Sequence, residues 1–351
     1  MRRPVVSTLA VAAGFFMLSA MTIEARKPVV PHGILALSSG NEVVLIQPGS
    51  DSEVVSLETG PVGFLFPAPG GVLFAPDVVN DRTNVIDIKA ARTGELISGV
   101  TMPHFGPWAD RYLVVAGALT MVSYPERSLI FRMDGSFDRP WQVQLGPEGT
   151  TVLILERTPS GKGGTTISAV DLGNRRVIYT KHFDHDLEHF FIAPGVGLLA
   201  VVDRSAGDIA LLNSKTLGEM RRLTVPNGAT DVVVLKGGRQ LVASGADGLL
   251  MRWDLKAKDD GLEIKADDPI DVAGRTTRLV VGPEGRLLAA ATDEGFLVLI
   301  DSKRGETLRQ WKIPTPIRDL KWIDSDRRGP ILPSWSDRGF GPEGVKLGAR
   351  K

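Results

Sequence analysis

The sequence of 351 residues contains no cysteine. This absence excludes disulfide bonds, metal sites built from thiolates, haem attached through cysteine and a lipid anchor on cysteine. The formal net charge is zero, because 41 Lys and Arg residues face 41 Asp and Glu residues. Without an overall field to attract polyanions, the chain has no electrostatic signature of a nucleic-acid partner.

Long helical periodicity is also lacking after the first 25 residues. The sequence instead has 39 glycines and 23 prolines, and 43% of its residues are hydrophobic. This composition is typical of many short strands joined by tight turns. We therefore predict an all-β fold.

One unit recurs seven times, at a spacing of roughly 40 residues. It consists of a Pro/Gly turn, a short apolar run, a polar turn and a second apolar run. The clearest copy lies between Gly245 and Leu255, where Asp247-Gly248 predicts a tight hairpin turn and the following strand contains Trp253-Asp254. The segment from Trp108 to Met133 is the most divergent copy; we count it as a blade, with an irregular insertion as the alternative.

The two ends of the repeat complete each other. Residues Gly33–Leu57 carry three strand-like runs without an inner first strand, and Pro316–Ile323 carries one strand without a blade after it. Pairing the last strand with the first three would remove an open sheet edge. The sequence thus predicts a seven-bladed β-propeller of four-stranded antiparallel blades, closed by its C-terminal strand.

Across Gly33–Ile323 the chain resembles a bacterial member of the WD-repeat and related seven-bladed propeller families. The best match is the Asp247-Gly248 turn with Trp253-Asp254; the family's Gly-His dipeptide is absent. Members of these families act mainly as rigid interaction platforms. The resemblance therefore implies binding rather than catalysis.

The first residues have the pattern of a secretory signal peptide. A short basic start, Met1-Arg2-Arg3, precedes the apolar run Val5–Ala20, and Ala25 or Ala20 offers a cleavage site. We expect residues 1–25 to be a signal peptide, with an uncleaved anchor as the alternative, and 26–323 to be the propeller. The mature chain would be periplasmic or extracellular, without a membrane span. Residues 324–351 form a basic tail rich in glycine and proline.

Three of the five histidines fall in one segment, at His182, His185 and His189. Imidazoles interspersed with carboxylates suit a divalent metal such as zinc, nickel or iron. The alternative is a polar loop between two blades, because loops face water. We expect no cofactor unless this segment holds a metal.

The register of the repeat predicts a second set of residues. Counting back five positions from each turn proline gives Gln142, His189 and Arg278, and alignment adds Asp231 and Asp319. Inner strands of a propeller line its central channel, so these residues would form a polar ring at one mouth. The ring is our candidate site for a ligand or partner, although polar residues there can also simply solvate the channel.

Two functions from different classes follow. The favoured one is a secreted scaffold that binds a protein or ligand, as a monomer or within a hetero-complex. The alternative is a metal-dependent propeller enzyme, a lyase or lactonase-like hydrolase, acting at the His182–His189 segment and the channel mouth. A quinone-dependent dehydrogenase fits less well, because the six tryptophans are not periodic. We assign no catalytic residue, since no Gly-x-Ser-x-Gly motif occurs.

Overall fold

The computed structural model describes residues 32–49, 54–99, 102–106, 108–137, 140–146, 148–158, 163–193, 197–235, 238–258, 261–272 and 274–324. The chain divides into two units, Met1–Val30 and Pro31–Lys351, and all described residues belong to the second. The predicted signal peptide and nearly all of the predicted tail therefore lie outside the described residues. None of the described residues forms a helix of the length and hydropathy that crossing a membrane requires.

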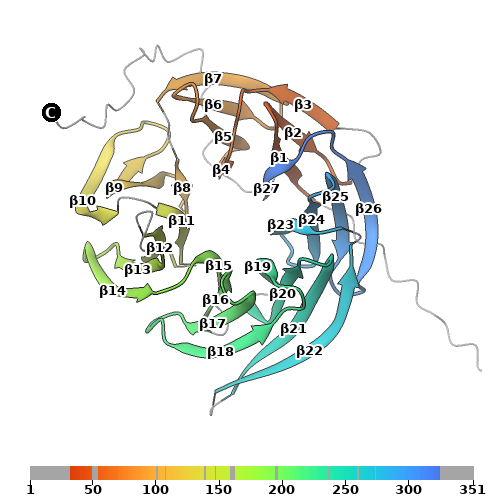
Figure 1. The fold of residues 1–351 in the computed structure, drawn as a ribbon. Helices are drawn as coiled ribbons and strands as arrows, with labels where there is room; N and C mark the ends of the chain where they lie inside the picture. The colour runs from red at the N-terminus through yellow and green to blue at the C-terminus, as the bar shows by residue number, and fades with distance from the viewer. Residues whose placement is uncertain are drawn as a thin grey trace, which may run out of the picture. The chain divides into compact units, whose positions relative to one another are not determined.

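The described residues form 27 strands in seven antiparallel sheets, which Figure 1 shows arranged as blades around a ring. Blade 1 contains β27 (Ile317–Ile323), β1 (Ile34–Ser39), β2 (Glu42–Ile46) and β3 (Val54–Glu58). Blade 2 contains β4 (Phe66–Ala68), β5 (Val72–Asp77), β6 (Arg82–Asp87) and β7 (Arg92–Ser98), and blade 3 contains β8 (His104–Phe105), β9 (Arg111–Ser123) and β10 (Leu129–Phe137). The predicted seven-bladed all-β fold is confirmed.

The remaining blades repeat one pattern, in which the first strand is innermost and the fourth outermost (Figure 1). Blade 4 contains β11 (Pro140–Leu145), β12 (Thr151–Arg157), β13 (Thr165–Asp171) and β14 (Arg176–Phe183), and blade 5 contains β15 (Leu187–Ala193), β16 (Leu198–Asp203), β17 (Asp208–Asn213) and β18 (Glu219–Thr224). Blade 6 contains β19 (Ala229–Leu235), β20 (Gln240–Gly245), β21 (Leu249–Lys258) and β22 (Gly261–Asp271). Blade 7 contains β23 (Thr276–Val281), β24 (Leu287–Thr292), β25 (Phe296–Asp301) and β26 (Glu306–Lys312).

Blade 1 closes the ring as the sequence predicts. Its innermost strand is β27, the last in the chain, which pairs antiparallel with β1 from Ile34 opposite Ile323 to Ser39 opposite Ile317. Three strands from the N-terminal side and one from the C-terminal side therefore make one sheet. This pairing covers the inner edge of β1, and β27 takes the innermost place that the first strand holds in the other blades.

Blade 3 is irregular because its second hairpin is very tight. The single element β9 turns back on itself at Gly117, whose φ is 69°, and the amide of Tyr124 donates to the carbonyl of Asp110 at 2.7 Å. Leu113 and Met121, at equal distances from the turn, pack in the same apolar cluster. The two arms of β9 are thus the second and third strands, and blade 3 has four strands like the others.

The core lies between the blades. Each of the seven apolar clusters in the described residues joins two neighbouring blades; for example, Val233 and Leu250 of blade 6 pack with Leu279 and Leu288 of blade 7. Strand β24 is buried along its whole length because it is covered on both faces. This explains why the second strands are continuous apolar runs rather than alternating ones. Trp253 lies in the cluster between blades 5 and 6 and is 6% exposed.

Candidate functional site at the channel mouth

The innermost strands of blades 4 to 7 and blade 1 share an irregularity near their first residues. In blades 4, 6 and 7 the pairing register shifts just before Gln142, Asp231 and Arg278. In blade 5 the shift spans His189, and in blade 1 it falls at the residue before Asp319. A bulge bends a strand and changes the direction of the side chains around it. The five predicted ring residues therefore occupy equivalent positions, at or next to the bulge of each inner strand (β11, β15, β19, β23 and β27 in Figure 1).

Three of the five ring residues join neighbouring blades. Gln142 donates to the carbonyl of Phe190 at 2.8 Å and accepts from the amide of Phe190 at 2.9 Å. Asp231 accepts from the amide of Leu279, and Asp319 from the amide of Leu65, both at 2.8 Å. These bonds connect blades 4 and 5, 6 and 7, and 1 and 2. Each one satisfies a main-chain amide that would otherwise be buried without a partner.

The other two ring residues form no such bond. The Nε2 atom of His189 is buried and has no hydrogen-bond partner among the described residues. Arg278 donates to the carbonyl of Thr277, its neighbour in sequence, at 2.7 Å. Within the described part of the chain Arg278 makes no ion pair. His189 and Arg278 are thus the ring positions with polar groups left to offer a ligand.

Burial lowers the pKa of two histidines, and nearby charges modify the effect. Burial lowers the pKa of His189, while Asp231 raises it and Arg278 lowers it to smaller extents. Burial and the ammonium of Lys321 lower the pKa of His104 on β8 to about 4. Lys321 also acts on His189, so its charge reaches imidazoles on blades 3 and 5. Both histidines are neutral at pH 7 and can donate or accept a hydrogen bond.

An aromatic cluster that sequence reasoning missed lies beside the ring. The rings of Phe64 and Trp141 meet edge to face with centroids 6.2 Å apart, although they come from blades 2 and 4. The guanidinium of Arg157 stacks on Trp141, 3.6 Å from the ring centroid. Phe64 is 38% exposed, whereas Trp141 Nε1 and Arg157 Nε are buried N–H groups without a partner among the described residues.

The sequence did carry a signal for this cluster. Counting back five positions from Pro69, the turn proline of blade 2, gives Phe64, by the same rule that placed Gln142. Trp141 directly precedes Gln142 and is the extra residue of the bulge in β11. The prediction covers polar side chains at these positions and therefore omits the aromatic members.

The three histidines of the predicted metal segment have separate neighbours. His182 is exposed at the end of outer strand β14, with Nδ1 3.3 Å from the hydroxyl of Thr166. His185 Nε2 lies 3.1 Å from the buried carboxylate of Asp203, and Arg222 donates a hydrogen bond to that carboxylate at 2.7 Å. His189 is on inner strand β15. Among the described residues no three His, Asp or Glu side chains are placed to hold a metal ion, so this geometry lends the metal prediction no support.

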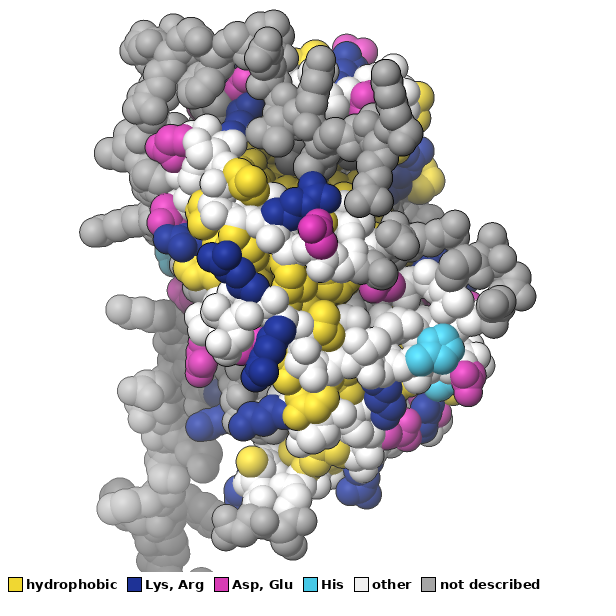
Figure 2. Space-filling model, turned by 90° about the vertical axis from the view of Figure 1, so that its left-hand side faces the viewer, with side chains coloured by type: hydrophobic (Ala, Val, Ile, Leu, Met, Phe, Trp, Pro, Cys, Tyr) yellow, Lys and Arg dark blue, Asp and Glu magenta, His cyan; other side chains and the backbone are white. Residues whose placement is uncertain are grey.

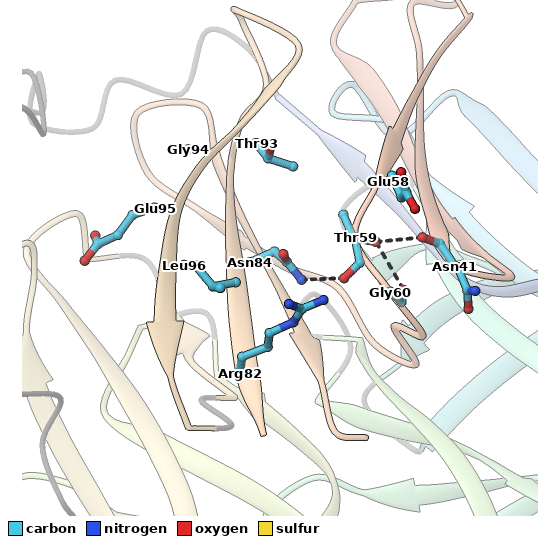
Figure 3. Close-up of a pocket in the computed structure, with 10 residues that line it drawn as sticks. All are labelled: Asn41, Glu58, Thr59, Gly60, Arg82, Asn84, Thr93, Gly94, Glu95 and Leu96. Atoms are coloured by element: carbon cyan, nitrogen blue, oxygen red, sulfur yellow. Dashed lines mark hydrogen bonds between the residues drawn. The ribbon is translucent and has the colours of Figure 1, made fainter. Parts of the chain in front are cut away.

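A separate polar pocket of ≈410 Å³ lies between the outer parts of blades 1 and 2 (Figure 3). The hydroxyl of Thr59 donates to the carbonyl of Asn41, and the amide of Asn84 donates to the carbonyl of Thr59 at 2.9 Å. Two of its three charged lining residues are engaged, since Arg82 pairs with Asp77 and Glu95 pairs with Arg127; the third is Glu58. The pocket therefore offers polar main-chain and amide groups and the carboxylate of Glu58, while its cation Arg82 is held by Asp77.

The comparisons with known proteins support the fold and indicate no specific function. No family model and no curated protein matches the chain. Among solved structures, hydrazine synthase of Kuenenia stuttgartiensis is similar with a TM-score of 0.59 and 13% identity, over 84% of this chain and 99% of that one. A putative 6-phosphogluconolactonase of Bacteroides fragilis is similar with a TM-score of 0.60 and 12% identity, over 85% of this chain and 100% of that one.

Together, the sheets and these similarities define the chain as a seven-bladed β-propeller. At 12% and 13% identity the likeness shows the fold alone and carries no activity across. Membership of the WD-repeat family stays a prediction from the sequence.

Proposed function

We propose that this chain is a secreted binding platform, periplasmic or extracellular, which engages a protein partner at the channel mouth. The observation that carries the proposal is the cluster of Phe64, Trp141 and Arg157 next to the ring. It combines an exposed aromatic ring with two buried N–H donors that have no partner among the described residues.

Such a cluster has the chemistry of an interface hot spot. Tryptophan and arginine are enriched among the residues that dominate binding energy, and the surrounding rigid scaffold limits the entropy lost on binding. A buried N–H without a partner costs about 1 to 3 kcal/mol, which an incoming carbonyl or carboxylate oxygen would recover. The neutral His189 and the cationic Arg278 provide further polar contacts at the same mouth.

The test is capture of a partner from an envelope extract of the source organism. The bait is the mature chain, compared with its Trp141→Ala and Arg157→Gln variants and with Leu308→Ala, a change at an exposed residue of outer strand β26, as the control. We expect wild type and Leu308→Ala to retain one stoichiometric partner and both mouth variants to lose at least tenfold in affinity. Far-ultraviolet circular dichroism and thermal unfolding establish that each variant is folded.

Capture that is equal for all four proteins would move the interface away from the mouth, and no stoichiometric partner would remove the platform proposal. The metal-dependent lyase or lactonase-like alternative has no particular observation in its favour, because His182, His185 and His189 have different neighbours. The lactonase activity in the name of the Bacteroides fragilis protein belongs to that protein, with which this chain shares its fold.

A further inference from the structure

The outer rim of blades 3 and 4 carries an unusual amount of exposed apolar surface. Leu129 and Ile130 on β10 are 63% and 44% exposed, and Val177, Ile178 and Tyr179 on β14 are 43%, 40% and 45% exposed. On each of the outer strands β3, β7, β18 and β26, a single large apolar side chain is exposed among the described residues (Val54, Leu96, Met220 and Leu308). Adjacent apolar residues on one rim mark an interaction surface more strongly than scattered ones do.

These two strands lie on neighbouring blades and form one surface, which we call the 3–4 rim. The guanidinium of Arg175, just before β14, lies over the ring of Phe131 on β10, 4.9 Å from its centroid. Figure 2 looks onto this side of the propeller, where hydrophobic side chains gather with Lys and Arg side chains among them. The rim is therefore an apolar strip with cations next to it.

The charges of the rim are predominantly basic. Arg175 and Arg176 are both exposed, and neither forms an ion pair with a described residue. Lys181 follows on the same strand, and β14 contains no acidic residue. On β10, Arg132 pairs with Asp134 at 2.9 Å and so adds no net charge.

Three possible occupants can be compared by charge and geometry. A second copy would bring a basic β14 against a basic β14, and the bulge at Ile178 interrupts the edge that two copies would pair. The chain's own C-terminal segment is also basic, with six Lys and Arg residues against two acids from Arg327 onward. An acidic segment with apolar side chains complements both features of the rim.

We propose that the 3–4 rim binds an acidic, apolar segment of a partner protein. The inference goes beyond the proposed function, because this surface lies on the outermost strands, whereas the mouth is built on the innermost ones (Figure 1). The apolar side chains of the segment would cover Ile130, Val177 and Tyr179. Its carboxylates would pair with Arg175 and Arg176, which fixes its position along the strip.

The test is site-specific photo-crosslinking in cells that produce the full chain. p-Benzoylphenylalanine replaces Ile178 at the rim and, as the matched control, Leu308, the corresponding bulge residue of outer strand β26. We expect a crosslinked heterologous protein at position 178 only, and peptide mapping should place the link in an acidic segment. The double variant Arg175→Glu, Arg176→Glu should reduce the crosslink at least fivefold, whereas Trp141→Ala at the mouth should leave it unchanged.

Each contrary result overturns the proposal. A crosslink to a second copy would make the rim a self-association surface, and a crosslink to residues 324–351 would make it the dock of the chain's own tail. Equal crosslinking at positions 178 and 308, a link mapped to a basic segment, or no effect of the charge reversal would show non-specific contact. Loss of the crosslink with Trp141→Ala would place the partner at the mouth rather than at the rim.

Discussion

The amide group of Gln142 shows how a single side chain can act on two blades. It both donates to and accepts from the main chain of Phe190, and so links blades 4 and 5 by two hydrogen bonds. Asp231 and Asp319 each accept one hydrogen bond from an amide of the next blade, because a carboxylate can only accept. A polar residue at a ring position is therefore not by itself evidence of a binding role.

Replacing Gln142 tests this reading. We expect Gln142→Leu to lower the free energy of unfolding by about 2 kcal/mol, because two hydrogen bonds are lost and the partly buried main chain of Phe190 keeps no partner there. Gln142→Glu should lose about half as much, since it can still accept from the amide of Phe190. Denaturant titration measures both, with the exposed Gln310→Leu as the control.

If Gln142→Leu unfolds at the same denaturant concentration as the Gln310→Leu control, the hydrogen bonds between blades 4 and 5 contribute no net stability. The result would then return Gln142 to the list of residues available for a ligand. The same comparison at Asp231 would show whether carboxylates act alike at this position.

At the scale of the single element, β9 shows what the sequence could and could not predict. The composite blade was predictable, because each end of the chain had strands without partners. The hairpin of blade 3 was not, because its turn depends on one glycine instead of the Pro, Asp or Asn residues that mark the other turns. Periodicity gave the apolar strands Arg111–Ala116 and Leu129–Met133, but it contains no information on how tightly the chain reverses between them.

The backbone conformation of Gly117 predicts the stability cost of replacing it. Its φ of 69° lies in the left-handed region, and a Cβ there would meet no atom within 4 Å. The whole cost of Gly117→Ala is thus a backbone cost, which we expect to be about 1 kcal/mol. Gly63→Ala is the matched control, because Gly63 also has open space around it but its φ is not positive.

Denaturant unfolding of the two variants decides the matter. A loss of stability in Gly117→Ala but not in Gly63→Ala supports the single-glycine hairpin. Equal stability of both variants would mean that the chain reverses elsewhere in blade 3.

The candidate site was only partly predictable for a similar reason. The repeat register correctly put Gln142, His189, Asp231, Arg278 and Asp319 at equivalent positions of the inner strands. It could not tell which of them bond to the next blade, because that depends on spacings between blades rather than along the chain. It also could not bring Phe64 and Trp141 together, since they lie two blades apart.

On the scale of the whole molecule, closure of the ring depends on β27. This strand pairs with β1 and contributes Leu320 and Ile323 to two apolar clusters. A chain that ends after Thr315 should expose the edge of β1 and associate through it. A chain that ends after Asp324 keeps β27 and is the control.

Size-exclusion chromatography with light scattering separates the two outcomes. We expect the chain ending after Thr315 to form oligomers or aggregates and the chain ending after Asp324 to match the full-length protein in size and thermal midpoint. A monomeric, equally stable product from the shorter chain would show that the ring does not need its composite blade.

The pairing of β1 with β27 also sets an order in time. The hydroxyl of Ser38 accepts from the amide of Asp319, a partner 281 residues away along the chain. Ribosomes make β1 among the first strands and β27 last, so blade 1 cannot be completed until almost the entire polypeptide has been synthesised. Contacts of such long range are slow to form. A late-closing ring therefore leaves the growing chain open, with the inner edge of β1 unpaired, for most of its synthesis.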